Sequence, residues 1–138
     1  MKKILAAVDG SIASIHAAKK ALELCDKMKC ELTLIHVAPP SVMPGEVAFA
    51  PMPDLRAAEL SRGAGILKDV QKALERTDVK TMNSLGSPAE LISDIANDEG
   101  FDLVVVGNKG RGAVSRMLLG SVADRLVHIC KRPVMVVR

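Results

Sequence analysis

Five short apolar runs, separated by longer segments with a helical period, constrain the fold of this chain more than any other feature. The runs span 3–8, 31–37, 79–85, 103–106 and 134–137. Most are unbroken by polar residues, which is typical of strands that helices cover on both faces. Because strand and helix alternate, the strands should pair in parallel through right-handed crossovers. The sequence therefore predicts a three-layer, doubly wound α/β domain with a five-stranded parallel sheet.

The segments between the strands carry apolar residues at helical spacing. The three apolar stripes are Ala18, Ala21, Leu22, Cys25 and Met28; Ile66, Leu67, Val70, Ala73 and Leu74; and Val122, Leu126 and Ile129. A further helix should begin at Pro88, because proline suits the first turn and Ser87 with Glu90 has the spacing of a capping box.

Composition excludes several classes of protein. A chain of 138 residues that is 49% hydrophobic and 25% charged has ordinary globular composition, and we expect one domain over 1–138. With two Phe, no Tyr and no Trp, the chain offers little aromatic stacking for a flavin or for single-stranded nucleic acid. The net charge of +3 is dispersed, which argues against a nucleic-acid partner. No stretch resembles a signal peptide or a membrane span, so we expect a cytoplasmic protein without a membrane partner.

The cysteines and histidines indicate no metal or redox centre. Cys25, Cys30 and Cys130 are odd in number and lack C-x-x-C spacing, so we interpret them as reduced core residues. The histidines, at 16, 36 and 128, show no metal spacing and no adjacent nucleophile, which favours packing or surface roles.

One connection is unusually long. Residues 38–54 form a Pro-rich loop that holds five of the seven prolines. It follows the second predicted strand and so starts at the carboxyl edge of the sheet, where open α/β sheets bind ligands. A lid over a pocket and an excursion without ligand contact both fit this composition.

A glycine-rich stretch after the fourth predicted strand indicates an anion site. Gly107, Gly110 and Gly112 permit positive φ and close approach by a ligand, and successive backbone N–H groups in such a turn can bind an anion. Gly120-Ser121 then opens a helix, where free N–H groups and the helix dipole favour phosphate. The alternative role for Ser121 is an N-cap, which contributes about 1 kcal/mol to the helix.

The common phosphate motifs do not match. There is no G-x-x-x-x-G-K-[ST] sequence, and Gly110-Arg111-Gly112 is followed by Ser115 instead of a third glycine. A receiver domain would need an aspartate after the third strand, where this chain has Asn83 and Ser84.

The glycine spacing resembles that of a known family. It is similar to the G-x2-G-x9-G-[S/T] signature of the ATP-binding branch of the universal stress protein family. In this chain two residues separate Gly107 from Gly110, and nine residues separate Gly110 from Gly120-Ser121. The segments "ILAAVDGS", "LTLIHVAPP", "LGSPAELI", "DLVVVGNKGRG" and "LLGSVADRLVHICKRPVMVV" extend the resemblance over nearly the whole chain. It implies a Rossmann-like fold of the adenine nucleotide alpha hydrolase type.

The resemblance also implies site residues. Asp9 would lie at the ribose or at a metal carried in with the nucleotide, and Val37 would meet adenine through its backbone. By itself, Asp9 could equally be the N-cap of the first helix. The glycine stretch would contact ribose and phosphates, and Lys109 and Arg111 would supply positive charge. The candidate nucleotide residues are Ala7, Val8, Asp9, Val37, Val106, Gly107, Lys109, Gly110, Arg111, Gly112, Gly120, Ser121 and Val122.

These residues favour a nucleotide-dependent regulatory or stress-response module that binds ATP with Mg²⁺. We find no catalytic base in the glycine stretch, but a slow ATPase or an autophosphorylating enzyme with the same pocket is the alternative. A third hypothesis is a protein that binds partner proteins without a ligand, and the intact glycine signature argues against it. The apolar run 134–137 would need a partner if it lay at the sheet edge, and family members typically pair through it, so we expect a homodimer.

Overall fold

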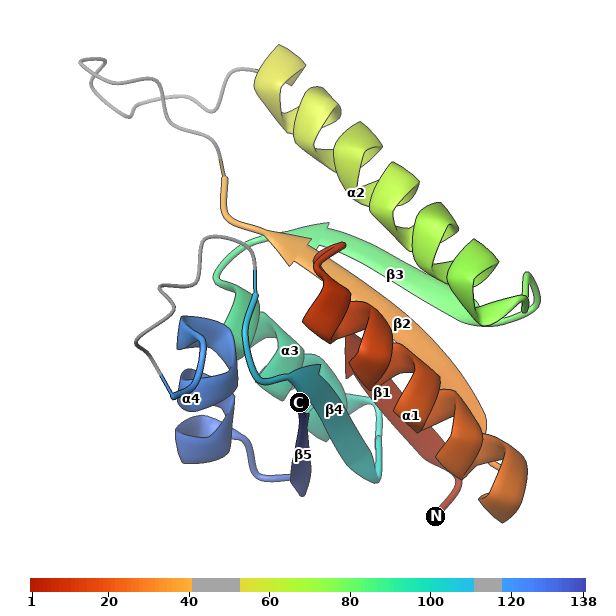
Figure 1. The fold of residues 1–138 in the computed structure, drawn as a ribbon. Helices are drawn as coiled ribbons and strands as arrows, with labels where there is room; N and C mark the ends of the chain where they lie inside the picture. The colour runs from red at the N-terminus through yellow and green to blue at the C-terminus, as the bar shows by residue number, and fades with distance from the viewer. Residues whose placement is uncertain (41–52, 111–117) are drawn as a thin grey trace.

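The computed structural model describes residues 1–40, 53–110 and 118–138, which form alternating strands and helices (Figure 1). The elements are β1 (Lys3–Ala7), α1 (Ile12–Met28), β2 (Glu31–Ala38), α2 (Pro53–Leu74), β3 (Lys80–Leu85), α3 (Pro88–Asp98), β4 (Leu103–Gly107), α4 (Ser121–Ile129) and β5 (Val134–Val137). All strand pairs are parallel, and the strand order is β3-β2-β1-β4-β5. The predicted α/β fold with a five-stranded parallel sheet is confirmed.

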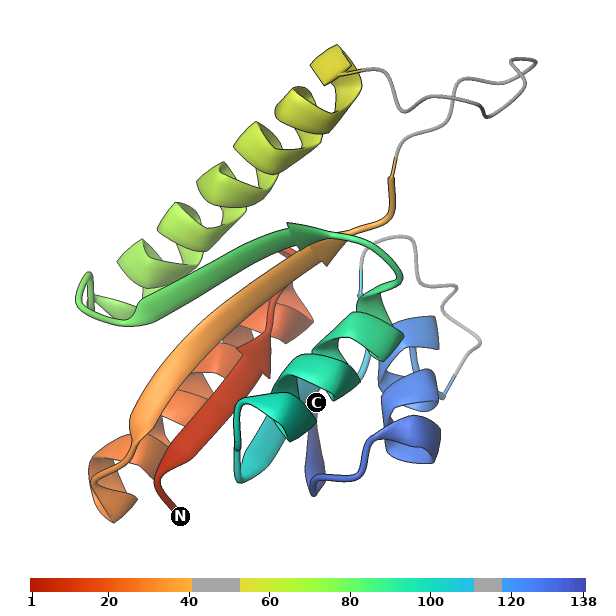
Figure 2. The ribbon, with the colours of Figure 1, turned by 180° about the vertical axis from the view of Figure 1, so that it is seen from behind.

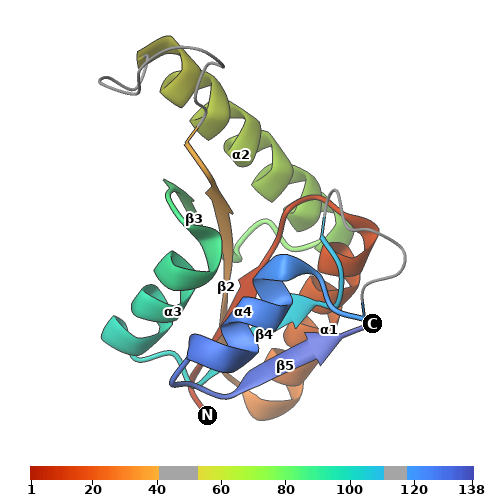
Figure 3. The same ribbon diagram turned by 90° about the vertical axis from the view of Figure 1, so that its left-hand side faces the viewer.

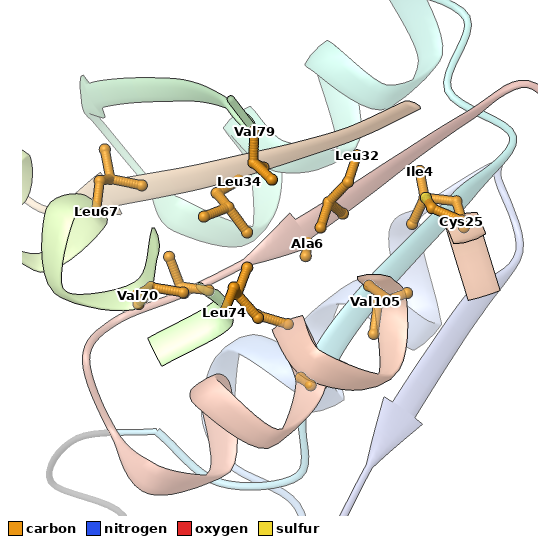
Figure 4. Close-up of a cluster of buried hydrophobic side chains, with 14 of the residues drawn as sticks. Ile4, Ala6, Cys25, Leu32, Leu34, Leu67, Val70, Leu74, Val79 and Val105 are labelled. Atoms are coloured by element: carbon orange, nitrogen blue, oxygen red, sulfur yellow. The ribbon is translucent and has the colours of Figure 1, made fainter. Parts of the chain in front are cut away.

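Helices cover both faces of the sheet. Views from opposite sides show α1 and α2 over one face and α3 and α4 over the other (Figures 1 and 2), and the edge-on view shows the sheet between them (Figure 3). Neighbouring strand residues point to opposite faces, so each face has its own core. One core contains Ile4, Leu34, Val70 and Val105 (Figure 4), and the other contains Leu5, Ile35, Ile92 and Leu126.

The strand order creates a switch point between β1 and β4. β1 and β4 are neighbours, with Leu5 paired to Val104, but the chain leaves β1 toward β2 on one side and leaves β4 toward β5 on the other. Connections that depart in opposite directions leave a crevice at the carboxyl ends of the two strands. The residues that follow β1 and β4 are therefore placed together by topology.

Several predicted boundaries and positions differ from the structure. Four strand ends shift by one residue, and the predicted Pro-rich loop over 38–54 is shorter, because Ala38 still pairs with Leu85 in the sheet and α2 begins at Pro53. The remainder of that segment, 41–52, lies outside the described residues, and with it the prediction of a lid. Met28 and Ala73 are exposed, because the buried stripes of α1 and α2 are narrower than predicted.

The start of α3 was predicted at the correct residue but for a partly wrong reason. Pro88 is the first helical residue, as expected, yet the Ser87 side chain makes no capping hydrogen bond to the described residues. The Ser87 backbone carbonyl instead accepts from the N–H of Leu91 at 2.9 Å. The proline, with its fixed φ, thus marks this helix start without the capping box.

Within the described residues, none of the helices combines the length and the apolar character that crossing a membrane requires.

Candidate functional site

The turn after β1 is held by its own side chains. Asp9 Oδ1 accepts from the N–H of Ser11 at 2.9 Å, and Ser11 Oγ accepts from the N–H of Ser14 at 3.2 Å. Ser11 is thus the N-cap of α1, and the alternative of Asp9 as that cap is wrong. Gly10 has φ +85°, a left-handed conformation that favours glycine. The turn presents the Asp9 carboxylate at the carboxyl edge of the sheet.

The turn after β4 packs closely against the turn after β1. A Cβ at Gly107 would lie 2.8 Å from the carbonyl carbon and oxygen of Ala13, and one at Gly110 would lie 2.6 Å from Asp9 Oδ2. Neither glycine has φ in the left-handed region, so the positive φ that glycine permits is not used at either position. These glycines are needed because other parts of the protein approach their backbone.

The start of α4 packs against the same turn. Gly120 N–H donates to the Asn108 carbonyl at 2.6 Å, and a Cβ at Gly120 would lie 3.1 Å from the backbone nitrogen of Gly110. Gly120 is the N-cap residue, so Ser121 is the first helical residue and the alternative of Ser121 as the cap is wrong. The N–H groups of the first helical turn lack partners within the helix itself. The backbone donors of two segments therefore face the same edge.

A cavity of about 290 Å³ lies at this edge, close to the lower end of the usual range for small-molecule sites. Eleven of the thirteen candidate residues line it, and the other two, Arg111 and Gly112, lie outside the described residues. The eleven are Ala7, Val8, Asp9, Val37, Val106, Gly107, Lys109, Gly110, Gly120, Ser121 and Val122.

The cavity also has an apolar wall, of which the sequence indicated Val37 alone. Ile35 and Val37 from β2, Ile92 from α3 and Ala123 from α4 contribute to it, and all four are buried in the core on that face of the sheet. An apolar wall beside a polar rim can hold a flat heterocyclic base without aromatic side chains. Ile92 carried no sequence signal beyond its place in a helix, because its neighbours at the cavity come from other elements.

Arg62 is a second cation at the cavity, besides Lys109, and was missed in the sequence. It lies on α2, which approaches the sheet closely at Gly63: a Cβ there would collide with Asn83 Oδ1 and lie 2.8 Å from His36 Cδ2. Asn83 Nδ2 also donates to the carbonyl of Leu60 at 2.7 Å, which ties α2 to β3. The glycine and the asparagine thus position α2 so that Arg62 reaches the cavity.

His36 is buried in β2 and also lines the cavity. Its Nδ1 donates to the Val8 carbonyl at 2.8 Å, which links β2 to the turn after β1. This contact agrees with the packing role expected from the sequence. In residues 1–40, 53–110 and 118–138, no three His, Cys, Asp or Glu side chains are grouped so that they could hold a metal ion by themselves.

The family of this chain follows from its sequence as a whole. The sequence profile of the Universal stress protein family matches residues 1–138. The chain belongs to the universal stress protein family. A universal stress protein of Methanocaldococcus jannaschii is 34% identical to it over 142 residues, covering 99% of this chain and 82% of that protein.

Solved structures of the universal stress protein family share the fold. Universal stress protein UspA from Lactobacillus plantarum superposes with a TM-score of 0.85 at 26% identity, covering 99% of this chain and 97% of that chain. A universal stress protein solved in complex with cAMP has a TM-score of 0.73 at 22% identity, again covering 99% and 97% of the two chains. Both likenesses extend over the whole α/β fold of this universal stress protein.

Proposed function

We propose that this universal stress protein binds ATP in the cavity at the carboxyl edge and acts as a nucleotide-dependent regulatory module. The observation that carries the proposal is the close contact between two backbones, the turn after β4 and the start of α4, at Gly110 and Gly120. Phosphate is bound in proteins by just such converging N–H groups and helix starts. Lys109 and Arg62 add positive charge at the same cavity.

The cavity also contains groups that suit the base and the ribose of an adenine nucleotide. The base would lie against the apolar wall, with the backbone of Val37 as its polar contact, and the ribose hydroxyls would donate to Asp9. A protein of the same fold has been solved in complex with cAMP, which is an adenine nucleotide. This likeness supports the class of ligand, and the extended anion-binding edge supports a triphosphate.

Mg²⁺ would enter with the nucleotide. Asp9 is the one acidic side chain among the described residues that line the cavity. A divalent cation on the phosphates would neutralise part of their charge, and Asp9 could approach it or the ribose. Repulsion between Asp9 and a triphosphate is relieved in either arrangement.

We favour binding over efficient catalysis because the glycine stretch from Gly107 to Gly120 contains no His, Asp or Glu that could act as a base there. Asp9, which accepts from Ser11 N–H, and His36, whose Nδ1 donates to the Val8 carbonyl, are the possible bases among the described residues of the cavity. Slow hydrolysis or autophosphorylation is the alternative outcome of the experiment below.

The test is to purify the protein under native conditions, identify any retained small molecule by mass spectrometry, and follow added ATP with Mg²⁺ by chromatography. We expect bound ATP that stays intact, whereas steady release of ADP would support the enzyme. Gly120→Val should abolish binding, because the larger side chain would push apart two backbones. Gly65→Ala is the matched control, since a Cβ there meets nothing within 4 Å. If the wild-type protein binds no adenine nucleotide, the proposal is wrong.

We also propose a homodimer that forms through β5. β5 is the last strand in the order of the described sheet and pairs there with β4 (Figure 3). Its residues, Val134–Val137, are only partly buried, and an apolar edge strand of this kind is a pairing surface. Sedimentation over a range of concentrations should give the dimer mass; a monomer throughout would refute this. The cytoplasmic location stays a prediction.

A further inference from the structure

Two of the three cysteines lie in contact at the far end of α1. The Sγ atoms of Cys25 and Cys30 are 3.2 Å apart. Both are free thiols in or against the core on one face of the sheet, as the sequence led us to expect, and they also contact each other. Cys130, in contrast, packs with the core on the opposite face of the sheet. The structure thus brings together two free thiols that are five residues apart and leaves the third elsewhere.

The contact follows from the way that α1 ends. Lys29 adopts a left-handed conformation with φ 55° and ψ 48°, and Cys30 N–H donates to the Cys25 carbonyl at 3.0 Å. This six-to-one hydrogen bond characterises a helix end in which the two bonded residues bring their side chains together. Backbone geometry therefore holds the two sulfur atoms in contact before any bond forms between them.

A second cavity, of about 210 Å³, gives access to the thiol pair. Cys30 is partly exposed, whereas Cys25 is only 3% exposed. The cavity is lined by charged side chains that pair with one another: Arg76 with Asp26 at 3.3 Å, and Lys80 with Glu31 at 3.3 Å. A small polar oxidant can enter such a site and reach Cys30 first.

The two thiols differ in their surroundings. Burial, and next the hydrogen bond with Cys30, raises the pKa of Cys25 to about 12, so this thiol stays protonated at neutral pH. Since the thiolate is the reactive form of cysteine, Cys25 is poorly suited to react directly with an oxidant in solution. Its contact with Cys30 at 3.2 Å, and not thiolate character, is what allows it to react with that sulfur once Cys30 has been oxidised.

We propose that Cys25 and Cys30 form a reversible disulfide when the protein meets hydrogen peroxide. The Cys30 sulfur attacks one peroxide oxygen, the O–O bond breaks, and the hydroxide that leaves takes the thiol proton as water, which yields a sulfenic acid. Cys25 Sγ then attacks Cys30 Sγ, the S–O bond breaks, and hydroxide leaves with the Cys25 proton as a second water. The cysteines lose two electrons and the peroxide gains them.

This modification site is separate from the nucleotide cavity. The cysteines adjoin the amino end of β2, whereas the cavity lies at the carboxyl ends of the strands. The disulfide would join the end of α1 to the residue before β2. Its formation can therefore be tested without nucleotide, and the result does not depend on the proposed function.

The experiment treats the reduced protein with hydrogen peroxide, blocks the remaining thiols with iodoacetamide, and digests the unfolded chain with trypsin without reduction. Cleavage after Lys20, Lys27, Lys29 and Arg56 separates the cysteines, so a disulfide links peptide 21–27 to peptide 30–56. We expect this linked pair, a fall from three free thiols to one, and reversal by dithiothreitol. Peptide mapping is needed because peroxide also oxidises methionine, which changes the mass of the whole protein.

Variants separate the proposed pair from other thiol chemistry. Cys130→Ser should form the linked peptides as wild type does, whereas Cys25→Ala and Cys30→Ala should each give none. If either alanine variant fails to fold, the peptide map of the wild type still decides. Cys30 found as sulfinic acid beside an unmodified Cys25, a disulfide that includes Cys130, or three intact thiols after treatment would overturn the proposal.

Discussion

Replacing Gly110 with alanine perturbs the candidate site at a single contact. A Cβ at this position would lie 2.6 Å from Asp9 Oδ2, whereas ordinary van der Waals contact begins at 3.4 Å, so the carboxylate must move by about 0.8 Å. The end of a side chain can move this far more easily than backbone. We therefore expect the Gly110→Ala protein to fold and the Asp9 carboxylate to leave its position.

The size of the effect follows from what Asp9 would do for the ligand. A hydrogen bond to a charged group contributes about 1.5–3 kcal/mol. Losing one such bond to a ribose hydroxyl would raise the Kd for ATP by about 10- to 150-fold. Isothermal titration calorimetry of Gly110→Ala against wild type measures this change, and a melting curve checks that the fold is retained.

A double-mutant cycle tests whether the effect acts through Asp9. If it does, adding Gly110→Ala to an Asp9→Ala protein should change the Kd by less than about twofold, because the displaced group is already absent. Gly65→Ala serves as the control: it should leave the Kd unchanged and stabilise α2 by about 0.5–1 kcal/mol. Wild-type affinity in Gly110→Ala, or an undiminished effect in the Asp9→Ala background, would refute this reasoning.

Three further predictions concern other positions. Gly107→Ala should destabilise the protein by about 1–3 kcal/mol in urea unfolding, because its Cβ would lie 2.8 Å from backbone atoms of Ala13. Arg62→Gln should weaken ATP binding about three- to tenfold in calorimetry and leave adenosine binding unchanged, as expected for a phosphate contact. Hydrogen bonds from the backbone N–H groups of Lys2 and Lys3 lower the pKa of Asp102. The resulting stability is present above about pH 4 and is lost as the pH falls through the lowered pKa. Asp102→Asn should thus be less stable than wild type at pH 7 and nearly equal to it in strong acid, as judged by urea unfolding at both pH values.

Much of the fold could be predicted because the signals for it are local. Unbroken β-branched runs such as 103–106 predicted buried parallel strands, and Pro88 predicted a helix start at the correct residue. The spacing from Gly107 to Gly120 indicated the family and the edge of the sheet where the cavity lies. Such patterns report how one segment is buried or where it begins, and that information lies within a few neighbouring residues.

Contacts between distant segments were decided only by the tertiary structure. The sequence indicated that Gly107 and Gly110 permit positive φ or close approach by a ligand, whereas the folded chain needs them because Ala13 and Asp9 pack against their backbone. Arg62 reaches the cavity only because α2 docks closely on the sheet. No pattern within a single segment records which other segment will approach it.

For the cysteine pair, too, the sequence determined one part and only the tertiary structure decided the other, although the two residues are close in the chain. The sequence determined that Cys25 lies on the buried stripe of a helix and that Cys30 precedes a strand. Whether their sulfur atoms meet depends on how that helix ends, and Lys29, in place of the usual glycine, gave no sign of a left-handed residue there. Apolar periodicity determines which face of a helix is buried, whereas the packing of α1 and β2 against the same core determines where the helix must stop and turn.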